Sequence, residues 1–281
     1  MKILFAGDLH LFNKIPISRL DDYPQTMLNK LKMILDIPSD YYIFSGDWFH
    51  TPDVSKEYTA KVIEVLQKYQ GKNIYTVIGN HDTNFGKTEN IENSSLGIIF
   101  ATGFVRRLTT VLVDDWSIYG CDYDQVPPIP EQDKNTILVA HKYYLENDAK
   151  EQITDEEADR FDFVFLGHEH QPKQFERNIF RIGSVSRMTG SKENTERDYF
   201  SVLLFDTETT KVQEKKFQVP DVFNKVFLDI RREMKKELKM NMDKIFETVQ
   251  NETLEKVLAL PNFNMFSDEV KQKFLELYNG L

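Results

Sequence analysis

Short apolar runs alternate with stretches of helical periodicity along the first part of the chain. The runs are residues 2–6, 41–44 and 74–78. Each of them is typical of a strand that is buried on both faces. Between them, residues 18–35 and 55–69 carry apolar side chains near helical spacing, and Ser55 is the expected N-cap of the second helix. The alternation predicts an α/β fold, in which helices cover a sheet.

The pattern changes in the second half of the chain. Apolar runs at residues 136–140 and 163–166 predict two more buried strands. After residue 162, the segments 175–182, 199–205 and 211–217 are expected to be strands of an antiparallel region. Residues 207–210 are the expected turn between the last two of these strands.

The last part of the chain has a helical pattern. Apolar residues recur every fourth position at Val222, Val226, Ile230, Met234 and Leu238. Pro220 marks the expected boundary. The sequence therefore predicts a catalytic domain over residues 1–220 and a helical C-terminal segment over residues 221–281.

Composition narrows the class of protein. A chain of 281 residues fits one large domain with an appendage, and its net charge of −10 argues against binding a polyanion over the whole surface. A local positive site stays open, because bound divalent metals are large local charges. Cys121 is the single cysteine, which excludes an intrachain disulfide. We find no secretory signal and no apolar stretch that could cross a membrane, so we expect a cytoplasmic protein.

All six histidines lie in short motifs that also contain a carboxylate, an amide, a lysine or glycines. The motifs are Asp8-Leu9-His10, Gly46-Asp47-Trp48-Phe49-His50, Gly79-Asn80-His81-Asp82, Ala140-His141-Lys142 and Gly167-His168-Glu169-His170. Each motif follows a predicted strand, and ligands of α/β sheets collect beyond the carboxyl ends of the strands. Any one motif alone is more often a turn or an incidental sequence. The full ordered set favours one metal-dependent site.

The candidate ligands combine oxygen and nitrogen without a thiolate. They are Asp8, His10, Asp47, Asn80, His141, His168 and His170. This mixture suits Mn²⁺, Fe or Zn²⁺ better than Ca²⁺, and it is too large for one tetrahedral zinc. Sharing the Asp47 carboxylate would give a two-metal centre, which can activate water and neutralise a phosphoryl group. On residue chemistry alone, His50 is also a candidate ligand.

The ordered motifs resemble those of the calcineurin-like metallophosphoesterase superfamily over about residues 1–205. In its serine/threonine phosphatases an acidic residue and an arginine follow the second Gly-Asp, whereas this chain has Trp48, Phe49 and His50. That motif is similar to the one in SbcD-type nuclease subunits, the prokaryotic and phage relatives of the eukaryotic double-strand-break repair nuclease. Residues 182–190 look most like the tailed-phage members.

The resemblance implies a four-layer α/β/β/α sandwich with a short helical C-terminal appendage. It implies a first metal held by Asp8, His10, Asp47 and His170, and a second held by Asp47, Asn80, His141 and His168. His81 would protonate the leaving oxygen or stabilise the transition state, with Asp82 as its orienting partner. His50 would contact the phosphate or assist catalysis, and not bind metal.

The resemblance also implies a function. We expect a DNA exonuclease or endonuclease of recombination, repair or replication, with two Mn²⁺ ions (alternatives Mg²⁺, Fe or Zn²⁺). Residues 221–281 would bind an SbcC-type coiled-coil ATPase, and helices beside the second and third motifs would form a homodimer. A phage-encoded protein would work in the host cytoplasm. Phe12 stands where many SbcD-type proteins have glycine, which leaves the substrate geometry open. The alternatives are a stand-alone phosphoesterase for small substrates and a non-enzymatic scaffold.

Overall fold

The chain forms two compact units, Met1–Phe223 and Asn224–Leu281. The structure, a computed structural model, describes residues 1–131, 135–144, 152–219 and 221–225, with positions 228, 229, 232, 236 and 239. The helices expected further along the second unit lie outside the described residues apart from these isolated positions, and so does Pro220. The division of the chain at residue 220 into a catalytic domain and a partner-binding segment stays a prediction.

The first sheet is built around three parallel strands, which the apolar runs predicted. Its strands are β1 (Lys2–Ala6), β2 (Tyr41–Phe44), β3 (Asn73–Thr76), β4 (Arg106–Arg107), β13 (Tyr199–Asp206) and β14 (Lys211–Gln218). They lie in the order β14-β13-β1-β2-β3-β4. Strands β1 to β4 are parallel, and the β13–β14 hairpin joins the edge of β1 in antiparallel pairing. The expected hairpin is therefore confirmed.

The second sheet also has a parallel centre. Its strands are β5 (Thr110–Val113), β6 (Trp116–Cys121), β7 (Asn135–Ala140), β10 (Phe163–Leu166), β11 (Lys173–Gln174) and β12 (Ile179–Arg181). They lie in the order β11-β12-β10-β7-β6-β5, and β6, β7, β10 and β12 run parallel. A small third sheet pairs β8 (Tyr143–Tyr144) with β9 (Gln152–Ile153).

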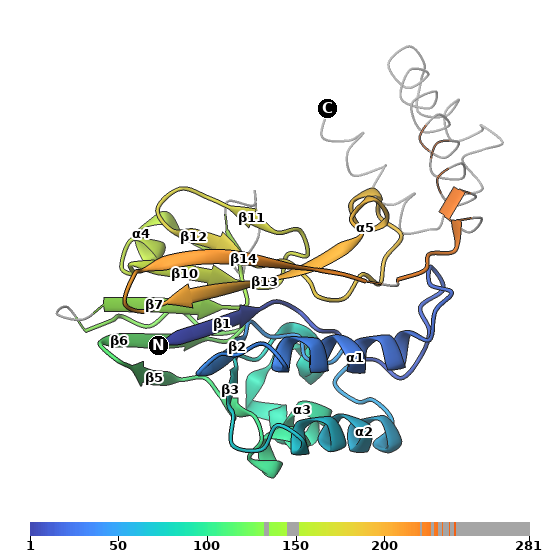
Figure 1. The fold of residues 1–281 in the computed structure, drawn as a ribbon, viewed down its shortest axis with the longest axis horizontal. Helices are drawn as coiled ribbons and strands as arrows, with labels where there is room; N and C mark the ends of the chain where they lie inside the picture. The colour runs from blue at the N-terminus through green and yellow to red at the C-terminus, as the bar shows by residue number, and fades with distance from the viewer. Residues whose placement is uncertain are drawn as a thin grey trace, which may run out of the picture. The chain divides into compact units, whose positions relative to one another are not determined.

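The two large sheets pack face to face between helical layers (Figure 1). The helices are α1 (Tyr23–Leu35), α2 (Lys56–Gln67), α3 (Ser95–Thr102), α4 (Asp155–Ala158) and α5 (Lys192–Glu196). Leu4 and Ala6 of β1 belong to the core under α1, α2 and α3, whereas Ile3 and Phe5 belong to the core between the sheets. A third core packs the outer face of the second sheet against α4 and β9. Because successive side chains of a strand point to opposite faces, each sheet packs on the other sheet with one face and on helices with its other face. This arrangement is the expected four-layer sandwich.

Two expected elements differ in the structure. The helix expected over residues 18–35 begins only at Tyr23, where the Asp22 side chain caps it and Pro24 occupies the first turn. The strand expected over residues 175–182 is interrupted by Arg177 and Asn178, which turn the chain at φ values of 60° and 57°. After that turn β12 pairs antiparallel with β11 on one side and parallel with β10 on the other, so the antiparallel prediction is correct only for the β11 side.

None of the helices in the described part of the chain has both the length and the apolar character to cross a membrane.

Candidate metal centre

The carboxyl ends of parallel strands from both large sheets deliver the predicted ligands to one place. They are Asp8 and His10 after β1, Asp47 after β2, Asn80 after β3, His141 after β7, and His168 and His170 after β10. Three of them have left-handed backbones, with φ of 48° at His10, 48° at Asp47 and 80° at His168. Such strain is rare for residues with a side chain and concentrates at functional sites.

A first group of ligand atoms comes from Asp8, His10 and His170, and these atoms lie within 4.8 Å of one another. The Nε2 atoms of His10 and His170 are 3.0 Å apart. Asp47 extends the group, because its Oδ2 lies 3.6 Å from His10 Nε2. The four residues expected to share the first metal are therefore neighbours.

A second group comes from Asp47, His141 and His168, again within 4.8 Å. The His141 Nε2 atom lies 3.1 Å from His168 Nδ1 and 3.1 Å from Asn80 Oδ1. It also lies 3.3 Å from Asp47 Oδ2, the same oxygen that faces His10. The Asp47 carboxylate thus stands between the two groups, where a bridging ligand is needed.

His50 and His81 lie beside the first group. Ligand atoms of His10, His50 and His81 also fall within 4.8 Å of one another, so this geometry alone does not separate ligands from catalytic groups. The His50 and His81 rings stack with centroids 5.2 Å apart. Phe12 closes this side, with its ring edge-on to His50 at 5.0 Å.

Asp82 has a different place from the one expected. Its Oδ1 accepts from the Phe49 N–H (3.0 Å) and its Oδ2 from the Gly79 N–H (3.0 Å). The His81 ring is oriented instead by its own Nδ1–H, which donates to the His50 carbonyl at 2.7 Å. Asp82 therefore joins the loops that carry the second and third motifs, and the His50 backbone orients His81.

Comparison with known proteins identifies the family. The family model described as calcineurin-like phosphoesterase matches residues 1–172. The chain belongs to the calcineurin-like phosphoesterase family. It is therefore a hydrolase, a metal-dependent phosphodiesterase whose family uses two metal ions. The family predicted from the ordered motifs is thus confirmed.

The chain is similar to two known proteins. The chain is 26% identical over 320 residues to the DNA double-strand break repair protein Mre11 of Methanococcus maripaludis, with 100% of this chain and 83% of that protein covered. It is also similar to a solved archaeal phosphodiesterase, at 17% identity and a TM-score of 0.41, over 77% of this chain and 100% of the other. The likeness to tailed-phage members stays a prediction.

Burial keeps most imidazoles of this phosphoesterase site neutral. It lowers the pKa of His168 to about 3 and that of His170 to about 4, and it holds the pKa of His10 well below its usual value. Burial and the neighbouring His81 lower the pKa of His50 as well. Neutral imidazole is the form that binds metal, so three predicted ligands are ready without losing a proton.

The remaining charged ligands influence one another. Burial opposes ionisation of Asp47, but His141 and His10 hold the pKa of that carboxyl well below its usual range. Burial also opposes the charge on His141, yet Asp47 and Asp8 raise its pKa to about 9. Burial raises the pKa of Asp8 to about 7. A bound cation reverses this balance, because it favours the deprotonated forms of both Asp8 and His141.

The donor set fits divalent cations. Within the described residues, Asp8 Oδ2 is buried without a hydrogen-bond partner, and His168 turns its Nδ1 toward His141 Nε2 at 3.1 Å. The ring of His141 is oriented because its Nδ1–H donates to the Ser45 carbonyl at 2.7 Å. Nε2, which faces Asp47, is then the nitrogen that a cation would bind once its proton has left. Buried carboxylate oxygens and aimed imidazole nitrogens are ligands for Mn²⁺, Fe or Zn²⁺.

Sequence reasoning missed several residues that shape the site. Ser45 was overlooked, although it stands directly before the Gly46-Asp47 motif. The Tyr143 ring lies edge-on to His168 with centroids 4.1 Å apart, and no sequence signal separates it from an ordinary strand residue. Gly46 has a φ of 99°, and a Cβ there would lie 2.6 Å from His141 Nδ1. The glycine before Asp47 is thus required by both its backbone and its close approach to a ligand.

Proposed function

We propose that this phosphoesterase is a two-metal DNA nuclease of the SbcD type that acts in DNA recombination, repair or replication. The observation that carries the proposal is the extent of the similarity to Mre11. It covers 100% of the chain, whereas the general family model ends at residue 172. His50 supports the proposal, because it belongs to the motif that resembles SbcD-type nucleases and it stacks on His81.

The chain's residues divide the work. Asp8, His10, Asp47 and His170 would hold the first cation, and Asp47, Asn80, His141 and His168 the second. When bound, the two cations, Mn²⁺ by preference, supply Lewis-acid activation of water and neutralise phosphodiester charge. The Nδ1–H of His81 stays on the His50 carbonyl, which holds the ring so that Nε2 can give a proton to the departing sugar oxygen. His50 contacts the phosphate.

A cleavage assay tests this proposal. Single- and double-stranded DNA are incubated with Mn²⁺ and wild type, His81→Ala or Asp47→Ala. The control is Lys61→Ala, whose exposed side chain pairs with Glu57 one helical turn away. We expect His81→Ala to lose about 10²- to 10⁴-fold in rate, Asp47→Ala to be inactive and the control to match wild type. Equal cleavage by all four proteins would refute the mechanism.

A substrate panel separates the nuclease from the alternative function. The alternative is a stand-alone phosphoesterase that acts on small phosphodiesters or phosphomonoesters. We expect oligonucleotides to be turned over faster than cyclic nucleotides or nitrophenyl phosphates. Faster turnover of the small substrates would replace the nuclease assignment.

An SbcC-type coiled-coil ATPase is the proposed partner of the C-terminal segment. Deleting residues 224–281 removes the second compact unit and keeps Asp221, Val222 and Phe223, which belong to the first unit and pack within it. In a pull-down we expect this deletion to abolish capture of the ATPase, while cleavage of short oligonucleotides persists. Full capture by the deletion protein would contradict the assignment.

A homodimer through α2 and α3 is the second proposed assembly. Ile98 of α3 supports it, because this large apolar side chain is 48% exposed. Sedimentation should show a dimer for wild type and a monomer for Ile98→Glu. A wild-type monomer at micromolar concentration would exclude this assembly.

A further inference from the structure

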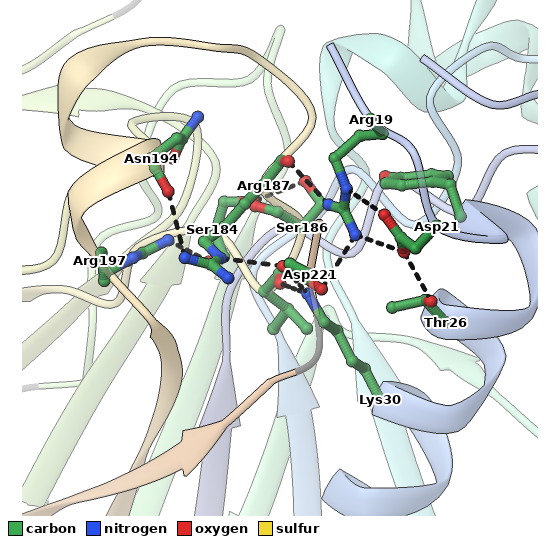
Figure 2. Close-up of polar contacts among 12 residues, drawn as sticks. Arg19, Asp21, Thr26, Lys30, Ser184, Ser186, Arg187, Asn194, Arg197 and Asp221 are labelled. Carbon is green, nitrogen blue, oxygen red and sulfur yellow. Dashed lines mark hydrogen bonds and ion pairs between the residues drawn. The ribbon is translucent and has the colours of Figure 1, made fainter. Parts of the chain in front are cut away.

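A buried charge cluster lies where the first compact unit ends. We name it the Asp221 cluster, and it consists of Asp221, Arg19, Lys30 and Arg187 (Figure 2). Arg19 Nη2 lies 2.9 Å from Asp221 Oδ1, while Lys30 Nζ (2.8 Å) and Arg187 Nε (2.9 Å) lie against Oδ2. All four side chains are at most 3% exposed. One carboxylate therefore contacts three buried cations, of which Arg19 also pairs with Asp21. Losing Asp221 would take the carboxylate away from Lys30 and Arg187 and leave Arg19 with Asp21.

The residues after Asp221 fix its position. The Leu20 N–H donates to the Val222 carbonyl at 2.8 Å, and Phe223 forms a β-bridge with Arg19. The Phe223 ring lies 5.2 Å from the Arg19 guanidinium. Asp221 is thus delivered to the cluster by a short backbone pairing and is not a chance surface contact.

The cations of the cluster also hold one segment of the chain, residues 184–187. Lys30 Nζ donates to the Val185 carbonyl at 3.0 Å, and Arg19 Nη1 donates to the Arg187 carbonyl at 2.8 Å. Both donors are the same groups that pair with Asp221 (Figure 2). The position of the 184–187 segment therefore depends on the Asp221 carboxylate.

The 184–187 segment in turn holds the backbone of two predicted ligands of the first metal. The Val185 N–H (3.0 Å) and the Ser184 hydroxyl (2.9 Å) donate to the Asp8 carbonyl. The Ser184 N–H donates to the His170 carbonyl at 3.0 Å. Because a ligand's direction follows its backbone, this segment sets where Asp8 and His170 point.

A third ligand of the first metal depends on the cluster through an aromatic ring. The Tyr23 hydroxyl donates to the His10 carbonyl at 2.9 Å, and the Arg19 guanidinium lies 5.1 Å from the Tyr23 ring. The second group shares one contact with the first, because the His168 N–H donates to Asp8 Oδ1 at 3.2 Å, but its other supports are different. His141 is oriented by the Ser45 carbonyl, and the Asn80 loop is tied by Asp82 through the Gly79 N–H.

We propose that Asp221 is a positioning residue of the metal centre that supports the first metal selectively. It acts through Lys30, Arg19 and Arg187 on the backbones of Asp8, His10 and His170. The inference rests on the proposed two-metal assignment. The residue that directly follows the expected boundary at Pro220 would then help to position the first metal's ligands. Asp221 does so indirectly, since its ion pairs are with Arg19, Lys30 and Arg187.

Metal binding by the 281-residue chain tests the proposal. Mn²⁺ is titrated by calorimetry into wild type and Asp221→Asn, which keeps the side-chain size and removes the charge. We expect two Mn²⁺ ions in wild type, and in the variant one site weakened about 10- to 100-fold with the other unchanged. His170→Ala and His168→Ala identify the sites. His170→Ala removes the first site, and adding Asp221→Asn should not change Mn²⁺ affinity at the second site that remains. His168→Ala removes the second site, and adding Asp221→Asn should weaken Mn²⁺ binding at the first site that remains.

Two further variants separate positioning from general destabilisation. Asp21→Asn is the matched control, because Asp21 pairs with the same Arg19 at 2.7 Å from its other side, and it should bind both ions like wild type. Lys30→Met removes the donor to the Val185 carbonyl and leaves two arginines on Asp221, so it should reproduce the selective loss even if Asp221→Asn does not fold.

Two ions bound as in wild type by both Asp221→Asn and Lys30→Met would overturn the proposal, and so would equal loss at both sites. A wild type that binds fewer than two ions would overturn the two-metal assignment and this inference with it. A wild type with two ions and unaffected variants would overturn this inference alone. The two failures are therefore distinguishable.

Discussion

The Nε2 atoms of His10 and His170 lie 3.0 Å apart, although 160 residues separate them in the chain. Burial lowers the pKa of both rings, so without metal the pair is neutral and shares a single proton in one hydrogen bond. A divalent cation in place of that proton can accept both lone pairs. The contact therefore ties the carboxyl end of β1 to that of β10 in a way that metal should strengthen.

The first prediction concerns removal of the metal. We expect a chelator to lower the melting temperature and Mn²⁺ to raise it, since a ligand at a hundredfold excess over its Kd stabilises by about 2.7 kcal/mol per site. His170→Ala should lose part of the Mn²⁺-dependent rise. Thermal denaturation followed by circular dichroism measures both effects. Identical melting curves with chelator and with Mn²⁺ would contradict a metal centre here.

The second prediction concerns pH. In the metal-free site His141 is protonated at neutral pH, because its pKa is raised to about 9. Asp8 is partly protonated there, because its pKa is raised to about 7. Binding requires both groups deprotonated, so apparent metal affinity should rise with pH from about 6 to about 9 and protons should be released. Calorimetry in two buffers of different ionisation enthalpy counts those protons. Constant affinity over this range would show that Asp8 and His141 do not ligate.

Much of the site was predictable because its ligands follow from local pattern. Continuous apolar runs such as residues 2–6 and 163–166 are buried on both faces, so they identify central parallel strands. Parallel strands end at one edge of a sheet, and that rule groups Asp8 with Asp47 in the first sheet and His141 with His168 in the second. The face-to-face packing of the two sheets then brings these groups together.

Other features depend on contacts that no local pattern contains. Asp221 directly follows the expected boundary at Pro220, and its partner Lys30 lies 191 residues earlier. The direction of β12 is decided by the turn at Arg177 and Asn178, both non-glycine residues at positive φ. Ser45 acts through its backbone carbonyl, which the identity of its side chain does not reveal.

The third prediction concerns Asp82→Asn. Asp82 accepts one backbone N–H on each carboxylate oxygen, from Phe49 and from Gly79. An amide has one acceptor oxygen, so one buried N–H loses its partner at a cost of about 1–3 kcal/mol in the free energy of unfolding. Chemical denaturation of the metal-free protein measures the loss. The exposed Asp53→Asn is the control and should stay within about 0.5 kcal/mol of wild type. A similar small effect at Asp82 would refute its role in joining the two loops.

The fourth prediction concerns Gly79→Ala, which tests whether Asp47 serves both metals. A Cβ at Gly79 would lie 2.0 Å from Asp47 Oδ1 and 2.4 Å from the Asp47 backbone nitrogen. The φ of −91° at Gly79 suits alanine, so the clash acts on Asp47 and not on the conformation of residue 79. Because Asp47 Oδ2 faces both His10 and His141, we expect Mn²⁺ affinity to fall at both sites together, by about 10- to 100-fold. The control is Gly71→Ala, where φ is +93° and nothing lies within 4 Å of the new Cβ. That change should cost about 1 kcal/mol of stability and leave metal affinity as in wild type. Calorimetry and denaturation on both variants separate the two effects, and loss of only one site in Gly79→Ala would mean that Asp47 does not bridge.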